Sequence, residues 1–167
     1  MAVIFLTGFM GAGKTTVGQL LAEQYGYRFI DTDQEIERLH QCSVRTIFQE
    51  KGEAQFREIE TEVLQKETTS KTVLSTGGGI VLSKANREWL SKEGIWVFLH
   101  VTPEEIYQRV KDDPHRPLLD GDPQERIQSL FEQRLSLYNE APIVIPTSEF
   151  TPKEVTVEVM NRIAHLI

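Results

Sequence analysis

The length and composition of the chain indicate one globular domain of moderate size. It has 167 residues, of which 40% are hydrophobic and 26% are charged, and a domain takes roughly 150 residues. A chain of this size buries enough apolar surface to fold without disulfides or a structural metal. The 18 Lys and Arg residues against 25 Asp and Glu residues give a net charge of −7. This charge disfavours nucleic acids and anionic membranes as partners.

Cysteine usage and the length of the apolar runs suggest an aqueous, reducing compartment. Cys42 is the only cysteine, so no internal disulfide can form. The apolar runs, such as Ala2–Leu6 and Ile95–Leu99, fall far short of the ~18 to 20 residues that cross a bilayer. The start of the chain also lacks the basic segment and long apolar run of a signal peptide. We therefore expect a cytoplasmic protein with no membrane partner.

Short β patterns alternate with longer helical patterns along the chain. Strands are predicted at Val3–Leu6, Arg28–Ile30, Thr72–Ser75, Ile95–Val101 and Ile143–Ile145, where β-branched and aromatic residues are enriched. Helices are predicted at 14–25, 34–40, 44–51, 53–67, 83–92, 103–111, 124–139 and 152–166. This order indicates an α/β fold with a parallel sheet that is buried on both faces.

Two segments break the regular alternation within the single domain of residues 1–167. Helical patterns fill most of 32–67, where one crossover helix would suffice, so we expect a helical insertion there. The segment 111–123 carries three prolines and a glycine and cannot continue a helix or a strand. It is predicted to be a mobile surface loop, and a plain solvated connection is the alternative.

The segment Gly8–Thr15 matches the pattern GxxxxGK[ST] between a predicted strand and a predicted helix. Its glycines let backbone N–H groups turn toward phosphate oxygens, and the N-terminus of the helix adds positive charge. Lys14 supplies a charge to the β and γ phosphates, and Thr15 offers a hydroxyl to Mg²⁺. A turn that only caps the helix would need neither the lysine nor the hydroxyl. The segment therefore predicts a nucleotide-binding P-loop.

Two carboxylates follow the second predicted strand. Asp31 and Asp33 project to the same side if the strand geometry persists, at the sheet edge where the glycine loop also lies. We expect Asp31 to hold Mg²⁺ through water, and Asp33 to contact the acceptor hydroxyl as a base or an orienting group. The alternative is that Asp33 caps the helix that follows, and the two roles do not exclude each other.

A run of three glycines follows the third predicted strand. Gly77, Gly78 and Gly79 would bring bare backbone N–H groups to the same edge of the sheet as the P-loop. A small polar ligand could approach them closely. The alternative is a flexible turn into the next helix.

Arg134 lies inside the apolar stripe of the helix predicted at 124–139, between Ile127 and Tyr138 on the same face. A guanidinium that faces inward needs an anion, because it cannot lose its proton. This anion could be a carboxylate of the protein or a bound anionic ligand, and the sequence leaves both alternatives open. Arg57 flanks another apolar face, and its spacing from Glu53 and Glu60 favours an ordinary ion pair on the helix surface.

The motifs together resemble, in order and spacing, those of the shikimate kinase family, which is similar to the nucleoside monophosphate kinases. They are GFMGAGKTT, FIDTD, GEAQFREIE, STGGG, RPLL beginning at Arg116 and RLSLY beginning at Arg134. The resemblance implies a three-layer α/β/α fold with a five-stranded parallel sheet in the order 2-3-1-4-5. It also implies transfer of the γ-phosphoryl of ATP to the 3-hydroxyl of shikimate, with Mg²⁺ as cofactor. We expect the enzyme to act as a monomer without nucleic-acid partners.

The resemblance implies roles for individual residues and for the two unusual segments. The insertion at 32–67 would bind the acceptor, and 111–123 would be a lid that brings Arg116 over the phosphates. The chain has Pro146 where the family usually has Asp, so it departs from the pattern at the adenine loop. The implied catalytic residues are Asp33, Lys14 and Arg116, and the implied metal ligands are Thr15 and Asp31. The implied shikimate ligands are Asp33, Arg57, Gly78, Gly79 and Arg134. The implied nucleotide ligands are Gly11, Ala12, Gly13, Lys14, Thr15, Thr16, Arg109, Arg116 and Pro152.

Two other functions use part of the same pattern. A kinase of another small acceptor, such as gluconate, would keep Lys14, Thr15 and Asp31 but would need other acceptor groups. A nucleotide-dependent switch would bind partners without phosphorylating a metabolite. The sequence contains no NKxD guanine motif, which argues against a GTPase-type switch.

Overall fold

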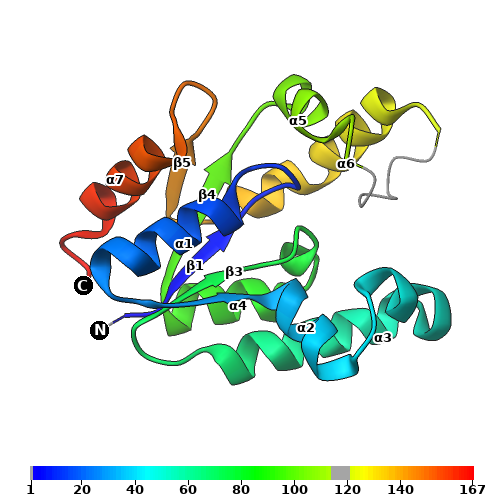
Figure 1. The fold of residues 1–167 in the computed structure, drawn as a ribbon, viewed down its shortest axis with the longest axis horizontal. Helices are drawn as coiled ribbons and strands as arrows, with labels where there is room; N and C mark the ends of the chain where they lie inside the picture. Colours follow the sequence, from blue (N-terminus) through cyan, green and yellow to red (C-terminus); the bar gives the residue numbers. More distant parts are fainter. Residues whose placement is uncertain (1, 114–120) are drawn as a thin grey trace.

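The structure is a computed structural model that describes residues 2–113 and 121–167. Its centre is a five-stranded sheet in the order β2-β3-β1-β4-β5 (Figure 1). All four neighbouring pairs are parallel, which confirms the predicted strand order. The strands are β1 (Ile4–Thr7), β2 (Arg28–Asp31), β3 (Thr72–Ser75), β4 (Ile95–His100) and β5 (Ile143–Pro146). Each lies within one residue of its predicted bounds.

Helices connect the strands and agree with most of the predicted helical segments. They are α1 (Lys14–Tyr25), α2 (Thr32–His40), α3 (Val44–Glu67), α4 (Lys84–Glu93), α5 (Pro103–Val110), α6 (Pro123–Tyr138) and α7 (Pro152–Ile163). A short 3₁₀ helix, η1 (Ile80–Leu82), follows the glycine run and was not predicted. None of the described helices is both long and apolar enough to cross a membrane.

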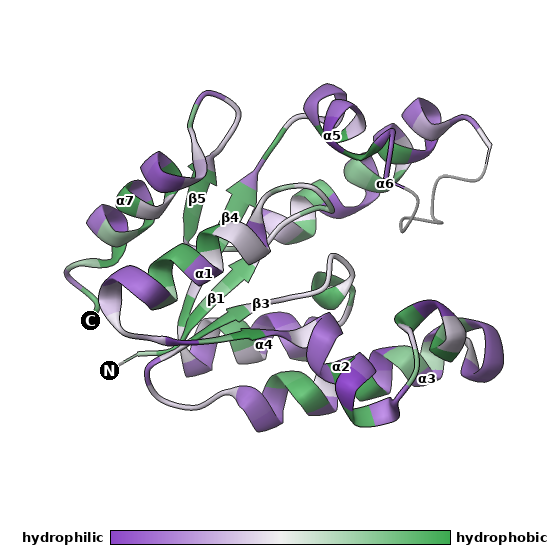
Figure 2. Cartoon of the chain, viewed as in Figure 1, coloured by the Kyte–Doolittle hydropathy of each residue, from purple (hydrophilic) through white to green (hydrophobic). Residues whose placement is uncertain are grey.

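The strands pack against helices on both faces, as a parallel sheet requires. Side chains alternate between the two faces of each strand. On one face of the sheet, Leu6 of β1 and Phe29 of β2 lie next to Gly18 of α1. On the opposite face, the Phe98 ring stacks on Tyr138 of α6, with centroids 5.0 Å apart. The strands are accordingly the most hydrophobic part of the chain, and the outer helices carry the hydrophilic residues (Figure 2).

The insertion between β2 and β3 has a small hydrophobic core of its own. Ile36 of α2 packs there with residues of α3 that include Ile47 and Phe56. At Gly52 the backbone of α3 leaves the helical region (φ 81°, ψ 168°), so α3 consists of two helical pieces. The break confirms the predicted separation of 44–51 from 53–67, and it occurs at a residue type that adopts this backbone conformation without a side-chain clash.

Candidate active site

The P-loop connects β1 to α1 in a conformation that depends on its glycines. Gly8 has φ 155°, and a Cβ atom there would lie 2.7 Å from the carbonyl oxygen of Leu99. Gly13 has the left-handed conformation (φ 88°) at the N-cap of α1. The Lys14 side chain folds back over this loop, and its Nζ donates to the carbonyl oxygens of Gly8 (2.8 Å) and Phe9 (3.0 Å). A lysine in this position can move onto a phosphate without displacing the backbone.

Thr15 and Asp31 lie in contact at the end of the P-loop. The Thr15 hydroxyl donates to Asp31 Oδ2 at 2.7 Å. The described residues contain no cluster of three or more His, Cys, Asp or Glu side chains that could enclose a metal ion. Mg²⁺ does not need such a cluster, because it keeps several waters and takes few protein ligands. One hydroxyl and one carboxylate beside a phosphate loop therefore fit this ion.

Asp31, and not Asp33, is the N-cap of α2. Its Oδ1 accepts hydrogen bonds from the backbone N–H groups of Asp33 (3.1 Å) and Gln34 (3.2 Å). The alternative expectation of an Asp33 cap is therefore wrong, because α2 begins at Thr32 directly after the strand. Since Asp33 is not used as the cap, its carboxylate remains available to the interior of the site.

The Asp33 carboxylate lies in a half-buried position beside the glycine run. Burial, and secondarily the nearby Asp31 carboxylate, raise the pKa of Asp33 to about 6, although Lys14 and Arg57 oppose the shift. A Cβ atom at Gly77 would lie 2.8 Å from Asp33 Oδ1 and 2.7 Å from Glu60 Oε1. Two carboxylates thus converge on the Gly77 backbone, where only glycine leaves room for them. A carboxyl group with a pKa near neutrality is suited to accept a proton from a hydroxyl.

Arg57 reaches the same place from α3. It pairs with the buried Glu60 at 2.9 Å and with the exposed Glu53 at 3.3 Å, so the expected ion pairs are present. Its guanidinium also occupies the space beside Gly79, where a Cβ atom would overlap it. Burial raises the pKa of Glu60 to about 7, against the lowering effect of Arg57. Within the described residues, Arg57 Nε and Glu60 Oε1 are buried without a hydrogen-bond partner, which leaves capacity for a polar ligand.

Arg134 enters from α6 on the other side of the glycine run. Its guanidinium lies 6.0 Å from the centre of the Phe9 ring. A Cβ atom at Gly78 would be 3.7 Å from Arg134 Nη1 and 3.6 Å from the Tyr138 hydroxyl oxygen. In the described part of the chain Arg134 forms no ion pair. Its positive charge opposes the rise in the pKa of the buried Glu60, so a carboxylate of the protein is also near this guanidinium.

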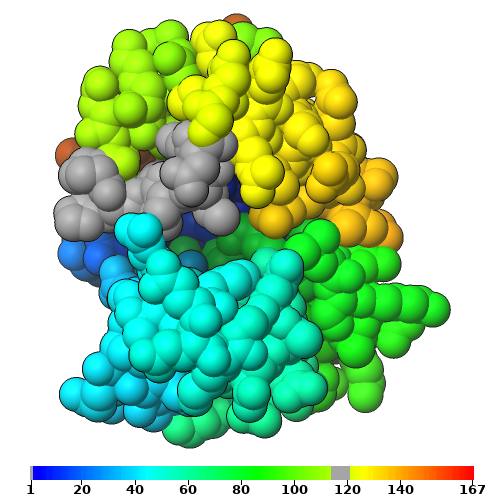
Figure 3. Space-filling model, turned by 90° about the vertical axis from the view of Figure 1, so that its right-hand side faces the viewer, coloured from blue at the N-terminus to red at the C-terminus, as the bar shows by residue number. Residues whose placement is uncertain are grey.

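These groups surround a hollow between the insertion and α6. Figure 3 shows a hollow between the residues of α2 and α3 and those of α6, with residues coloured as the N-terminal part of the chain visible at its floor. The five predicted acceptor ligands come from the insertion, the glycine run and α6, and the side chains among them lie beside the glycine run. They are Asp33, Arg57, Gly78, Gly79 and Arg134.

The predicted nucleotide ligands are only partly brought together. Arg109 of α5 donates from Nη1 to the carbonyl oxygen of Gly11 at 2.7 Å, and it pairs with Glu105. It therefore lies next to the P-loop, and its role as the adenine-stacking side chain remains a prediction. Pro152 is an exposed residue at the start of α7, and its role at the adenine remains a prediction. Arg116 lies outside the described residues.

Residue spacing did not reveal two buried residues that lie beside the glycine run. Glu60 was interpreted as a surface partner of Arg57, yet its side chain is only 1% exposed. Tyr138 was placed only as a core residue, although its hydroxyl contacts Gly78. The available signal for Tyr138 was its position four residues after Arg134 in the same apolar stripe, which places the two side chains together.

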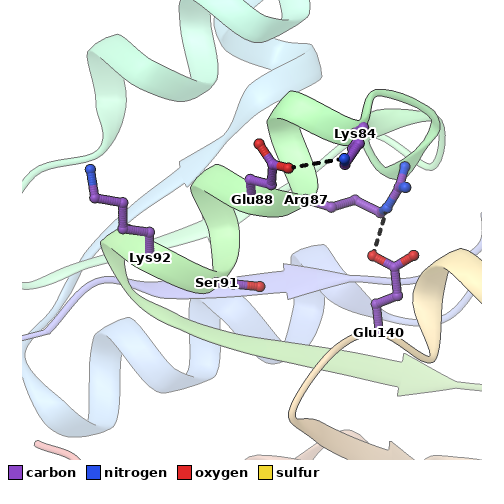
Figure 4. A pocket seen from close by; sticks show the side chains of 6 residues that line it. All are labelled: Lys84, Arg87, Glu88, Ser91, Lys92 and Glu140. Atoms are coloured by element: carbon purple, nitrogen blue, oxygen red, sulfur yellow. Dashed lines mark hydrogen bonds and ion pairs between the residues drawn. The ribbon is translucent and has the colours of Figure 1, made fainter.

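A second concavity, of about 520 Å³, lies away from these residues on α4 (Figure 4). It is lined by Lys84, Arg87, Glu88, Ser91, Lys92 and Glu140. It contains none of the P-loop or glycine-run residues. Its main feature is Arg87, which donates to Glu140 (2.7 Å) and to the carbonyl oxygen of Val81 in η1 (2.8 Å). This contact fastens η1 to the segment that follows α6.

Comparison with known proteins identifies the family. The family model described as shikimate kinase matches residues 10–164. A shikimate kinase of Bacillus cytotoxicus is 42% identical over 98% of this chain and 99% of its own length. One of Persephonella marina is also 42% identical, over 98% of this chain and 99% of its own length.

Solved structures agree with this result. The shikimate kinase from Acinetobacter baumannii in complex with shikimate superposes with a TM-score of 0.94 and 39% identity, covering 99% of this chain and 94% of the other. A gluconokinase from Sinorhizobium meliloti, at 18% identity and a TM-score of 0.64, shares only the fold; it covers 99% of this chain and 93% of its own. The P-loop, the acceptor cluster and the full-length similarity lead to one conclusion: the chain belongs to the shikimate kinase family.

Proposed function

We propose that this chain transfers the γ-phosphoryl group of ATP to the 3-hydroxyl of shikimate, giving shikimate 3-phosphate and ADP. Membership of the family supports this function over phosphorylation of gluconate. The observation that carries it is the pair of guanidinium groups, from Arg57 and Arg134, on either side of the glycine run and next to Asp33. Such a cluster matches a small hydroxy acid, because the arginines can bind the carboxylate while Asp33 accepts from a hydroxyl.

The residues that receive the acceptor also account for its selection as an acid. Each hydrogen bond between a guanidinium and a carboxylate contributes about 1.5 to 3 kcal/mol. Arg57 is already oriented by Glu60 at 2.9 Å, and Arg134 by its contacts with Phe9 and Tyr138. Little freedom is therefore lost when an acid binds. An uncharged analogue would offer neither guanidinium group a carboxylate to bind.

Phosphoryl transfer depends mainly on alignment and neutralisation of charge. Lys14 would bind the β and γ phosphates, and Asp33 would take the proton of the attacking hydroxyl. Thr15 and Asp31 would hold Mg²⁺, directly and through water, and the bound ion would supply charge neutralisation at the phosphates. The contact between the Thr15 hydroxyl and Asp31 at 2.7 Å supports this pairing.

The remaining assignments extend this proposal. The segment 111–123 would act as a lid whose closure excludes water and brings Arg116 to the phosphates. Arg109 and Pro152 would bind the adenine. The insertion at 32–67 would move with the acceptor that it binds. We further propose that the enzyme acts as a cytoplasmic monomer without nucleic-acid partners, in line with its net charge of −7.

A panel of acceptors tests the proposed function. The purified chain is assayed with ATP and Mg²⁺ against shikimate, gluconate and nucleoside monophosphates, and ADP release is followed by a coupled reaction. We expect turnover with shikimate and almost none without an acceptor. Turnover of another acceptor in the absence of shikimate turnover would refute the proposal. Slow nucleotide hydrolysis that no acceptor stimulates would instead indicate a switch.

A further inference from the structure

Tyr138 is the last residue of α6 and lies between two groups that the acceptor site needs. Its hydroxyl donates to the carbonyl oxygen of Gly78, and Arg134, one turn earlier on α6, lies close enough to oppose the rise in the pKa of this hydroxyl. A guanidinium can only donate and a phenol can do both. The Tyr138 hydroxyl can therefore accept from the Arg134 guanidinium while it donates to the Gly78 carbonyl.

The tyrosine is held rigidly in this position. Its side chain is fully buried, and its ring stacks on Phe98 of β4 with an interplanar angle of 12°. Burial raises the pKa of the Tyr138 hydroxyl to about 12, in spite of the opposing effect of Arg134. The hydroxyl thus keeps its proton at neutral pH and remains a donor to Gly78.

Fixing the Gly78 carbonyl also fixes the next backbone N–H. In a planar trans peptide, the C=O of one residue and the N–H of the next point in opposite directions. When Tyr138 holds the carbonyl of Gly78, the N–H of Gly79 is turned away from α6. Neither glycine has a side chain that would restrain this peptide, so the hydrogen bond from Tyr138 supplies the restraint.

We propose that Tyr138 is a positioning residue for the acceptor. It holds the Arg134 guanidinium and the Gly78–Gly79 peptide in one fixed arrangement, so that the acceptor carboxylate and ring meet preformed partners. This inference rests on the proposed function. It concerns binding of the acid and not the chemical step, because the groups that Tyr138 contacts, Arg134 and the Gly78 carbonyl, belong to the acceptor side of the proposed site.

The variant Tyr138→Phe tests the proposal because it removes only the hydroxyl and keeps the ring that stacks on Phe98. We expect the KM for shikimate to rise about tenfold, the effect of losing one hydrogen bond to a charged group. The KM for ATP should stay within about twofold. The matched control is Tyr27→Phe, at a buried tyrosine that directly precedes β2, which should leave both values unchanged.

A second measurement separates positioning of Arg134 from a general loss of structure. The methyl ester of shikimate lacks the charge that Arg134 binds, so Tyr138→Phe should reduce kcat/KM less for the ester than for the acid. Shikimate binding is also measured by calorimetry at low temperature, which gives a value even if the variant has a lower Tm. An unchanged KM for shikimate, an equal loss for acid and ester, or an equal loss for ATP and shikimate would each overturn the proposal. Failure of the proposed function is distinguishable, because then the unmodified chain would not turn over shikimate at all.

Discussion

Asp33 shows how a single buried carboxylate can reduce the stability of the fold at neutral pH. Its pKa is raised to about 6 in the folded chain from an ordinary value of 3.8. The stability that it contributes is therefore fully present below pH 3.8 and is lost as the pH rises through about 6. At neutral pH the fold holds an ionised carboxylate that burial disfavours. Such a position agrees with the proposed role of Asp33 as a proton acceptor, because a shifted pKa of this kind is common at functional sites.

We expect Asp33→Asn to reduce kcat by about 10²- to 10⁴-fold, the usual contribution of a general base. ATP affinity should change little, and the Tm at neutral pH should rise, because the amide carries no buried charge. Steady-state kinetics and thermal unfolding measure the three quantities. The control is Glu23→Gln on the exposed side of α1, which should alter none of them. A normal kcat in Asp33→Asn would remove this residue from catalysis.

The pH dependence of the reaction should follow the same carboxylate. Asp33 must be ionised to accept a proton, so kcat/KM for shikimate should fall as the pH drops through about 6. Glu37 is an exposed residue of α2 whose negative charge raises the pKa of Asp33. Removing this charge favours the ionised form of Asp33.

The variant Glu37→Gln should therefore move the acid limb of the pH profile to lower pH, with the plateau unchanged. The glutamine keeps an oxygen that can accept from the backbone N–H of Val44, as Glu37 does at 2.9 Å. The shift should shrink at high salt, because the interaction crosses solvent. A limb that stays in place at low salt would show that a group other than Asp33 controls it.

The sequence predicted the charged residues of the site better than their surroundings. Asp31 and Asp33 were placed correctly at the sheet edge, because they come at the end of a predicted strand and the carboxyl ends of parallel strands lie at one edge of the sheet. The alternative that Asp33 caps α2 was wrong, since local spacing cannot show whether the strand ends one residue earlier or later. The burial of Glu60 was missed, because residue spacing along α3 does not reveal which side of this helix is covered by a neighbouring element.

At the scale of elements, the glycine run differs from position to position in the room that it leaves for a Cβ atom. Gly79 has an ordinary backbone conformation (φ −91°), so an alanine there would meet no backbone strain. Its Cβ atom would overlap the Arg57 guanidinium, which is the far end of a flexible side chain. A Cβ atom at Gly78 would be no closer than 3.6 Å to its neighbours, an ordinary contact.

We therefore expect Gly79→Ala to raise the KM for shikimate strongly and to lower the Tm, because Arg57 must turn away from its buried partner Glu60. The paired variant Gly78→Ala should raise this KM less, since it displaces neither arginine. Kinetics with varied shikimate and thermal unfolding of both variants provide the comparison. Equal effects of the two alanines would show that displacement of Arg57 is not the cause.

Helices and strands were predicted well where the spacing of hydrophobic residues and the position of a glycine indicated the same boundary. The break at Gly52 followed from a glycine between two helical patterns, and the structure has it. The strand order could not follow from the sequence pattern alone, because alternation of strands and helices fits several orders; it came from the family resemblance. The 3₁₀ helix η1 was missed because it has only three residues, all apolar, which is too few to show a helical spacing of hydrophobic side chains.

For the molecule as a whole, the two substrate sites share one edge of the sheet. Lys14 of the P-loop lowers the pKa of Asp33 at the acceptor site. A Cβ atom at Gly78 would lie 3.8 Å from the carbonyl oxygen of Gly8, which Lys14 contacts. A ligand that orders one loop therefore orders part of the other, and the second ligand then loses less conformational freedom.

We accordingly expect shikimate and ADP to bind with positive coupling. The affinity of each should improve about fivefold or more when the other is saturating, the lower end of typical couplings between sites. Calorimetric titration in both orders measures the four dissociation constants, and ADP avoids turnover. The factor must be the same in both directions, because coupling between two sites is reciprocal. Inorganic phosphate in place of ADP is the control and should give a smaller factor, since it does not span the P-loop and Arg109. Dissociation constants that are independent of the second ligand would show that the two loops are ordered separately, and the shared edge would then serve only to bring the reacting groups together.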